Sequence, residues 1–226
     1  MVLVGGLSTA FPGHKFLAEE SADGKMTLST EPTWIIDPID GTTNFVHRIP
    51  HIAICVALYV DRKPSLGIVY NPILDDLYTA RSGKGAFLNG FRIHVSDAEA
   101  LPGAIVYGSY GMHNQSSETT DKYVAAFRSM IEAGIQGERA FGAAAINMTM
   151  VARGAGDVMF EFGTRIWDVA ASGLIVTEAG GILCDPNGGP QCPFDPLSRR
   201  VLAAASEKLA AEAASCIPKI EVPRDD

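Results

Sequence analysis

Two aspartates three positions apart, Asp37 and Asp40, are the residues of this chain best suited to chemistry. They follow the apolar run 34–36, which is typical of a buried strand. Carboxylates at a strand end are ligands that hard cations such as Mg²⁺ prefer. The next residues, 41–43, form a Gly-Thr-Thr turn that predicts the start of a short helix. Because backbone amides at a helix N-terminus suit phosphate, the segment predicts a metal site beside an anion site.

A structural interpretation of these aspartates is the alternative, because Asp-Pro and Asp-Gly pairs are common turn residues. Further acidic residues at the ends of other predicted elements favour the chemical interpretation. Glu19 and Glu20 follow a short apolar segment, and Glu161 lies late in a segment that alternates like a strand. Asp168 stands in the first turn of a predicted helix, where the helix dipole would equally explain an acidic residue.

The elements that must position these residues change in character along the chain. The first part predicts a largely antiparallel meander, with an Asn-Gly hairpin turn at Asn89-Gly90. Its strands are expected at 16–18, 34–36, 51–59, 66–70, 76–81 and 85–90, with a return strand at 92–96. The second part predicts strands at 105–109, 157–162, 181–184 and 201–205, and helices at 121–132, 143–153, 166–179 and 206–216.

We expect a single domain over residues 1–226. Residues 1–13 show neither helical nor strand periodicity and predict an irregular lead-in. The sheet that carries the metal site should occupy roughly residues 14–110, and a second α/β half roughly residues 111–226. The Pro- and Gly-rich stretch 185–198 predicts a loop.

Composition excludes several classes of partner. The formal net charge of −8 argues against nucleic acid and against an anionic membrane surface. The chain has no apolar run approaching the length of a membrane span, and its apolar start is short and lacks a basic region, so no signal peptide is expected. The four cysteines include no Cys-x-x-Cys pair, which argues against zinc and favours a reduced, cytoplasmic compartment.

Two long motifs point to a known family. The first is Trp34-Ile35-Ile36-Asp37-Pro38-Ile39-Asp40-Gly41-Thr42-Thr43-Asn44-Phe45. The second is Trp167-Asp168-Val169-Ala170-Ala171, followed by Glu178-Ala179-Gly180-Gly181. Shorter matches in the same order are Glu19-Glu20-Ser21, the segment 67–72 and the segment 83–90. On these motifs the chain resembles the inositol monophosphatase family from about residue 14 to the C-terminus.

The resemblance implies a fold and an activity. The expected fold is α/β (α+β), a layered α/β/α/β sandwich of the sugar-phosphatase type. The helical layer that the family forms at its N-terminus should be missing, since residues 1–12 do not resemble it. The expected activity is Mg²⁺-dependent hydrolysis of inositol monophosphate, a small-molecule phosphate ester, to inositol and phosphate. Lithium sensitivity and a homodimer are also implied by the resemblance.

The resemblance also assigns roles to individual residues. Two or three Mg²⁺ ions would be bound by Glu19, Asp37, the carbonyl of Ile39, Asp40 and Asp168. The catalytic set would be Glu19, Thr42 and Asp40, with Thr42 contacting the attacking water. The phosphate and the inositol would be bound by Asp40, Gly41, Thr42, Gly142, Ala143, Ala144, Glu161 and Asp168. His47 and Arg48, which lie near this site in the sequence, are interpreted as structural.

Two alternatives stay open. One is a phosphatase for another small phosphate, such as a sugar bisphosphate, histidinol phosphate or a 3′-phosphonucleotide, although Glu161 favours inositol. The other is a catalytically silent, shortened protein. In the family, the segment that is expected to be missing provides an acidic partner for the residue matching Thr42, so its loss predicts weaker activation of water. A further departure is Ala143, which stands where the family commonly has a threonine.

Overall fold

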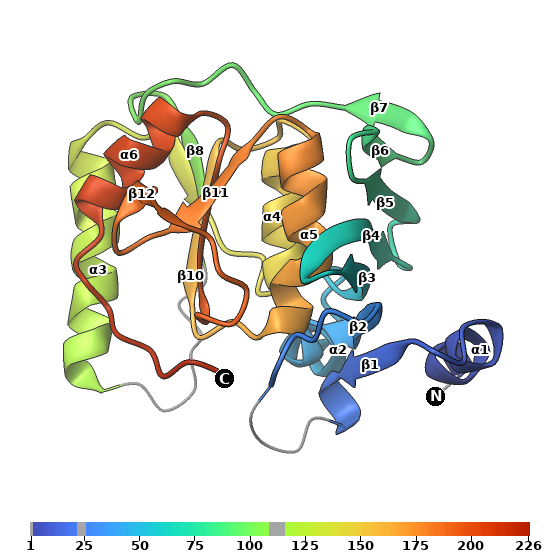
Figure 1. Cartoon of the computed structure of the whole chain (residues 1–226). Helices are drawn as coiled ribbons and strands as arrows, with labels where there is room; N and C mark the ends of the chain where they lie inside the picture. Colours follow the sequence, from blue (N-terminus) through green and yellow to red (C-terminus); the bar gives the residue numbers. More distant parts are fainter. Residues whose placement is uncertain (1, 22–25, 109–115) are drawn as a thin grey trace.

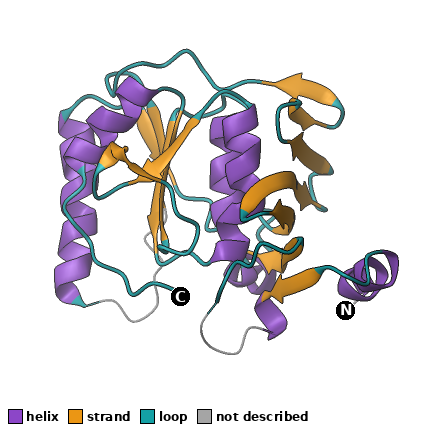
Figure 2. Ribbon diagram, viewed as in Figure 1, coloured by secondary structure: helices purple, strands orange, loops and turns teal. Residues whose placement is uncertain are grey.

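Two β-sheets and two pairs of helices alternate as layers in the computed structural model of the protein (Figures 1 and 2). The structure describes residues 2–21, 26–108 and 116–226. A central pair of helices, α4 (Ala144–Ala152) and α5 (Ile166–Glu178), separates the two sheets. A second pair, α3 (Ser117–Glu132) and α6 (Glu207–Cys216), covers the outer face of one sheet. This arrangement confirms the predicted α/β/α/β sandwich.

The first sheet is the predicted meander. Its seven strands lie in the order of the sequence, with β1 and β2 parallel and all other neighbours antiparallel. The strands are β1 (Lys15–Ala18), β2 (Thr33–Asp40), β3 (Ala53–Val60), β4 (Lys63–Asn71), β5 (Asp76–Arg81), β6 (Gly85–Leu88) and β7 (Phe91–Ile93). Asn89 and Gly90 form the turn between β6 and β7, and both have positive φ angles, as the predicted hairpin requires.

The second sheet is mixed and has the order β12-β11-β13-β10-β8-β9. Its strands are β8 (Ile105–Gly108), β9 (Gly137–Arg139), β10 (Val158–Phe162), β11 (Ile182–Asp185), β12 (Gly189–Pro193) and β13 (Arg200–Ala204). The strand β8 runs parallel to β9 and β10, whereas β10 and β13 are antiparallel. Most buried side chains of this sheet and of the central helices come from segments that are apolar in the sequence.

Burial on both faces of β2 explains its nearly continuous apolar sequence. Successive side chains of a strand point to opposite faces. Ile35 packs in the cluster that contains the central helices, whereas Trp34 and Ile36 pack on the opposite face with Val56. The outer cluster also receives partly buried side chains from α1 (Val2–Ala10). The strand that delivers Asp37 and Asp40 is thus fixed from both sides.

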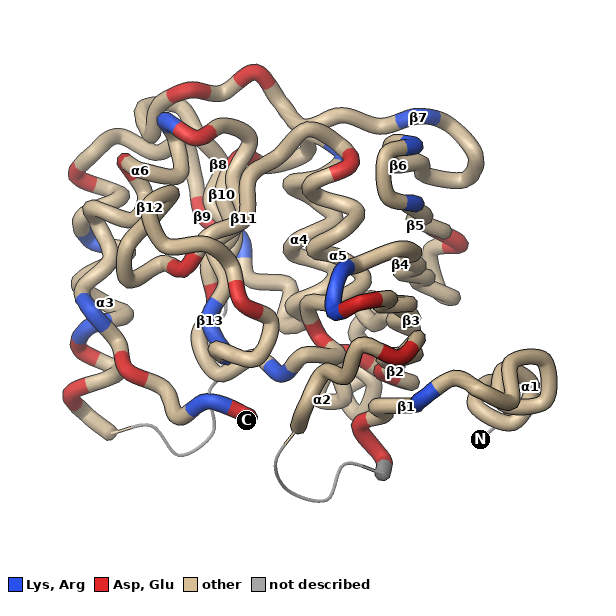
Figure 3. The backbone as a smooth tube through the Cα atoms, viewed as in Figure 1, with Lys and Arg blue, Asp and Glu red and all other residues tan. Residues whose placement is uncertain are grey.

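The structure corrects four predictions at the local level. Residues 1–13 were expected to be irregular, but Val2–Ala10 form α1, an uncharged helix beside the first sheet (Figure 3). Val4 and Leu7 of this helix pack, partly buried, against the outer cluster, and such packing rather than intrinsic propensity stabilises a short helix. The predicted loop 185–198 contains β12, the predicted return strand 92–96 ends at Ile93, and β9 was missed. All three corrected strands are short edge pieces whose pairing depends on a neighbour.

The other predicted elements are present with ends shifted by a few residues. Ser206 accepts a hydrogen bond from the Leu209 amide as the predicted N-cap of α6. Two predictions fall partly outside the described residues: the last residue of the strand 105–109, and the division of the chain at residues 110 and 111.

Replacing Gly67 by alanine tests how closely α5 packs on β4. A Cβ at this position would lie 2.6 Å from the carbonyl oxygen of Ala171, so one element would have to shift. We expect the free energy of unfolding to fall by about 1–3 kcal/mol, the usual cost of overpacking. The control is Gly6→Ala in α1, where a Cβ meets nothing within 4 Å. Denaturant unfolding that gives equal stabilities for Gly67→Ala and the unmodified protein would contradict this packing.

Candidate metal and phosphate site

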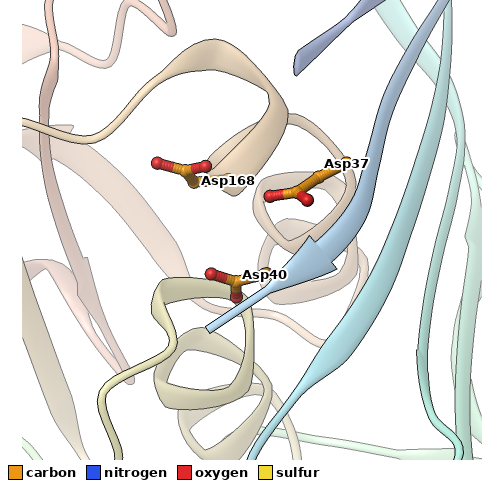
Figure 4. Close-up of side chains that lie close together, drawn as sticks. All are labelled: Asp37, Asp40 and Asp168. Carbon is orange, nitrogen blue, oxygen red and sulfur yellow. The ribbon is translucent and has the colours of Figure 1, made fainter. Parts of the chain in front are cut away.

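Three carboxylates from two elements converge at one end of β2 (Figure 4). Asp37 and Asp40 lie on β2, and Asp168 lies in the first turn of α5. One oxygen of each side chain lies within 4.8 Å of an oxygen of the other two. Among the described residues, this is the group of acidic, histidine and cysteine side chains that could hold a metal ion. The structure thus brings together three of the carboxylates that the resemblance assigns to the metal.

An irregularity in β2 allows its two aspartates to face the same space. In a regular strand, residues three positions apart point to opposite faces. The pairing of β2 with β3 shifts register here, because Asp37 pairs with Cys55 whereas Asp40 pairs with Ala53. The extra residue is typical of a β-bulge, which redirects a side chain. Figure 4 shows the carboxylates of Asp37 and Asp40 turned toward that of Asp168.

Backbone amides from three different segments orient these carboxylates. The Ile39 amide donates to Asp37 Oδ1 at 2.9 Å. The Ala145 amide, at the start of α4, donates to Asp40 Oδ2 at 2.8 Å. The Arg165 amide, just before α5, donates to Asp168 Oδ2 at 2.7 Å. Each carboxylate keeps further lone pairs for a cation, because one donor occupies only one of them.

The cluster is electrostatically costly when no cation is bound. Asp37 and Asp40 are only 2% and 7% exposed, and Asp168 is half-buried. Burial, followed by the charges of Asp168 and Glu19, raises the pKa of Asp37 to about 8. Burial and the charge of Asp40 raise the pKa of Asp168 to about 8, and burial raises the pKa of Asp40 well above its usual range. A divalent cation would offset both the burial and the repulsion.

The donor atoms fit a hard cation. The carboxylates open into a polar cavity of about 200 Å³. Its lining consists of Glu19, Asp37, Ile39, Asp40, Gly41, Thr42, Thr43, Gly142 and Asp168. The side chains in this lining offer oxygen ligands and no sulfur or imidazole nitrogen, a set that suits Mg²⁺ or Ca²⁺ rather than Zn²⁺.

Glu19 reaches the cluster through the parallel pairing of β1 with β2. Ala18 pairs with Ile36, so the next residues of both strands, Glu19 and Asp37, emerge at the same edge of the sheet. Glu19 begins the short 3₁₀ helix η1 (Glu19–Ser21) and is exposed. Its carboxyl is close enough to raise the pKa of Asp37 through both its charge and a hydrogen bond.

Gly41 and Thr42 lie beside the carboxylates, where β2 passes into α2 (Thr42–His47). Gly41 has φ +86°, and a Cβ there would lie 2.9 Å from the carbonyl oxygen of His51. Glycine is therefore required for this turn. A side chain would be strained by the backbone angle and would collide with the carbonyl of His51, which precedes β3. Gly142 also has a positive φ and lines the same cavity.

The remaining predicted residues lie outside the lining of the cavity. Ala143 and Ala144 are buried beneath it, where the Cβ of Ala143 lies 3.1 Å from the position that a Cβ on Gly41 would take. Glu161, half-buried near the end of β10, acts on the site through its charge, which raises the pKa of Asp40. Arg48 ends α2 with a positive φ and donates its amide to Phe45, which fits a structural role.

Sequence reasoning missed Asn44 as an organiser of the site. Its side chain is buried in α2, and its Nδ2 donates to the carbonyls of His51 at 2.7 Å and Phe141 at 2.6 Å. These bonds tie the Gly41-Thr42 turn to the segment that carries Gly142. The available signal was a polar residue inside the first motif, but its two acceptors are backbone atoms that no residue type reveals.

The comparisons with known proteins agree with this geometry, and the chain belongs to the inositol monophosphatase family. The family model matches residues 1–221. The expectation that residues 1–12 fall outside the resemblance was therefore wrong. Members of this family are phosphoric monoester hydrolases.

Individual relatives are similar over 95% or more of the chain. Inositol monophosphatase 1 of Homo sapiens is 43% identical over 100% of this chain and 80% of its own length. The extragenic suppressor protein suhB from Bartonella henselae is 34% identical, with a TM-score of 0.81 over 95% of this chain and 84% of that one. The inositol monophosphatase of Thermotoga maritima is 30% identical, with a TM-score of 0.81 over 95% and 78% of the two chains.

The pKa shifts predict how a cation affects stability at different pH values. In the metal-free protein, Asp37 and Asp168 titrate near 8 when folded and near 3.8 when unfolded. Their protonated forms therefore favour folding at low pH, and this contribution is lost as pH rises through about 8. We expect Mg²⁺ to raise Tm, relative to EDTA, much more at pH 8 than at pH 5, as thermal unfolding would show. A gain in Tm that is equal at both pH values, or absent at pH 8, would contradict the assignment.

Proposed function

We propose that this protein hydrolyses inositol monophosphate to inositol and phosphate in a Mg²⁺-dependent reaction. The observation that carries the proposal is the convergence of Asp37, Asp40 and Asp168 beside the Gly41-Thr42 turn in one polar cavity. Membership of the inositol monophosphatase family supports it, as do curated relatives that are named inositol monophosphatase.

The proposed cation ligands are Glu19, Asp37, the carbonyl of Ile39, Asp40 and Asp168, for two or three Mg²⁺ ions. All five residues line the cavity. Bound Mg²⁺ would neutralise the phosphate dianion, stabilise the leaving oxygen and lower the pKa of a water. A cavity with so many carboxylates repels a phosphate ester unless cations are bound, so cation and substrate binding should be coupled.

The chain itself would orient the substrate and the water. The amides of Gly41 and Thr42 would donate to the phosphate, since they stand at the start of α2 and lie in the cavity. The carboxylate of Glu19 would accept a hydrogen bond from the attacking water, and the hydroxyl of Thr42 would contact the same water. Asp40, Asp168, Glu161 and the segment Gly142, Ala143 and Ala144 would bind the phosphate and the inositol.

A second candidate function is hydrolysis of a nucleotide phosphate. A dual-specific inositol monophosphatase/NADP phosphatase is 26% identical to this chain, with a TM-score of 0.82 over 95% of it. Sugar bisphosphates, histidinol phosphate and 3′-phosphonucleotides belong to the same class of small phosphate esters. The same carboxylate cluster would serve all of them, because it acts on the phosphate group rather than on its alcohol.

Several finer properties belong to this proposal. We propose inhibition by lithium, a homodimer, one domain over the whole chain and a cytoplasmic location. The four cysteines are all free, which supports a reducing compartment. No helix among the described residues is long and apolar enough to cross a membrane. Lithium titration of the activity and size-exclusion chromatography with light scattering test the first two properties.

Phosphate release by the full chain provides the test of the proposed substrate. We expect Mg²⁺-dependent release from inositol 1-phosphate, with a higher kcat/KM than for NADP, fructose 1,6-bisphosphate, histidinol phosphate or a 3′-phosphonucleotide. A preference for a nucleotide would replace inositol phosphate as the proposed substrate. No release of phosphate by protein with a normal circular dichroism spectrum would favour the catalytically silent alternative.

Asp40→Asn and Asp168→Asn test the metal ligands separately from the fold. Each change removes a ligand charge while conserving volume. We expect kcat/KM to fall by about 100-fold or more, because even residues that merely support metal ligands often account for 10- to 100-fold. Metal-free stability should be retained or increased, since one repulsive charge is gone. The control is Asp61→Asn, on the exposed β3–β4 turn, which should remain fully active. Near-normal activity of Asp168→Asn would refute the ligand assignment.

A further inference from the structure

Asp225 lies outside the cavity. Its buried carboxylate binds two arginines. Its side chain is 0% exposed and forms ion pairs with Arg165 and Arg199. It lies in the segment 217–226, which follows α6 and runs to the C-terminus (Figure 1). Backbone bonds fix its place: the Asp225 amide donates to Leu197, and its carbonyl accepts from Met26 at 2.8 Å.

Arg165 belongs to the loop that joins β10 to α5, and Arg199, which stands just before β13, is hydrogen-bonded to that loop. Arg165 immediately precedes α5, and its amide orients Asp168. Arg199 donates from Nη2 to the carbonyl of Gly163 at 3.2 Å, and its own carbonyl accepts from the Gly163 amide at 2.7 Å. This loop therefore leads from Glu161 directly to Asp168, and Asp225 is bonded to both of the cations that border it.

Charge makes this arrangement important for the acidic cluster. The guanidinium of Arg165 lies close enough to lower the pKa of Arg199, after the larger effect of burial. The charges of Asp225 and Asp168 act on Arg199 in the opposite direction. If Asp225 lost its charge, Asp168 would be the remaining carboxylate that attracts Arg199 in this way. An arginine drawn toward Asp168 would compete with a divalent cation for the same carboxylate.

We propose that Asp225 is a positioning residue for the metal site: its carboxylate neutralises Arg165 and Arg199 and so keeps Asp168 available to the cation. The proposal rests on the proposed function, in which Asp168 is a cation ligand. It goes beyond that function by assigning a role in cation affinity to a residue that does not line the cavity. A purely structural role for Asp225 would affect folding stability but not the affinity of the folded protein for a cation.

Calorimetric titration of the full chain with Mn²⁺, a spectroscopically active substitute for Mg²⁺, tests the proposal without requiring turnover. We expect Asp225→Asn to weaken Mn²⁺ binding by about 10- to 100-fold, the range found for residues that support metal ligands. The Mg²⁺ concentration for half-maximal phosphate release should rise in parallel, while kcat at saturating Mg²⁺ changes little. Glu221→Gln is the matched control: Glu221 lies in the same segment and pairs with Arg200, and its loss should leave the affinity unchanged.

The double variant Arg165→Gln/Asp225→Asn separates the charge effect from a structural effect. Removing one of the two cations should restore Mn²⁺ affinity to within about three-fold of the unmodified protein, because less positive charge then competes for Asp168. The double variant also serves if Asp225→Asn alone does not fold. Affinity of a folded double variant that stays 10-fold weak would overturn the proposal, as would unchanged affinity in Asp225→Asn.

A failure of the proposed function would look different. In that case the unmodified protein would bind no Mn²⁺, or the Asp168→Asn variant would bind Mn²⁺ as tightly as the unmodified protein. Either result would also refute the role of Asp225. Mn²⁺ binding that Asp168→Asn abolishes and Asp225→Asn leaves intact would overturn the role of Asp225 alone.

Discussion

The repulsion among Asp37, Asp40 and Asp168 is the constraint on which the rest of this structure depends. Oxygens of three carboxylates lie within 4.8 Å of one another in a largely buried place. Without a cation this arrangement opposes folding, so the rest of the fold must provide the stabilising free energy. That free energy comes from the apolar cores on both sides of the first sheet and around α4 and α5, which bury enough surface to tolerate one unfavourable cluster.

The site is assembled where several elements begin or end. The ends of β1 and β2 and the starts of α2, α4 and α5 all point at one cavity. Strand ends deliver side chains, and helix starts deliver backbone amides that have no partner within the helix. The same principle explains the orienting bonds from Ala145 and Arg165, which use such amides on carboxylates rather than leaving them to solvent. These amides therefore contribute only partial positive charge, at fixed positions. Bound cations would have to provide the rest of the charge that balances the three carboxylates.

Rigid support extends beyond the residues that line the cavity. Asn44 bonds two carbonyls from different segments, and Asp225 bonds two arginines from different loops. Each is a buried polar side chain with at least one partner far from it in the sequence. A buried polar group with good partners specifies one arrangement, because any other arrangement leaves it unsatisfied. These contacts connect the segments that surround the three carboxylates, although neither residue lines the cavity.

The sequence by itself determined most strands and helices, and its long motifs carried the resemblance that implied the layered fold. Alternating and continuous apolar runs reveal strands, and the long motifs contain Asp37, Asp40 and Asp168, the carboxylates that lie close together in the structure. Only the tertiary structure decided that residues 2–10 are helical, that 189–193 pair as a strand, and that a register shift in β2 turns two aspartates to one side. It also decided which partners the buried side chains of Asn44 and Asp225 have. These features depend on partners distant in the chain, and local residue patterns carry no information about which distant atoms will be within hydrogen-bonding distance.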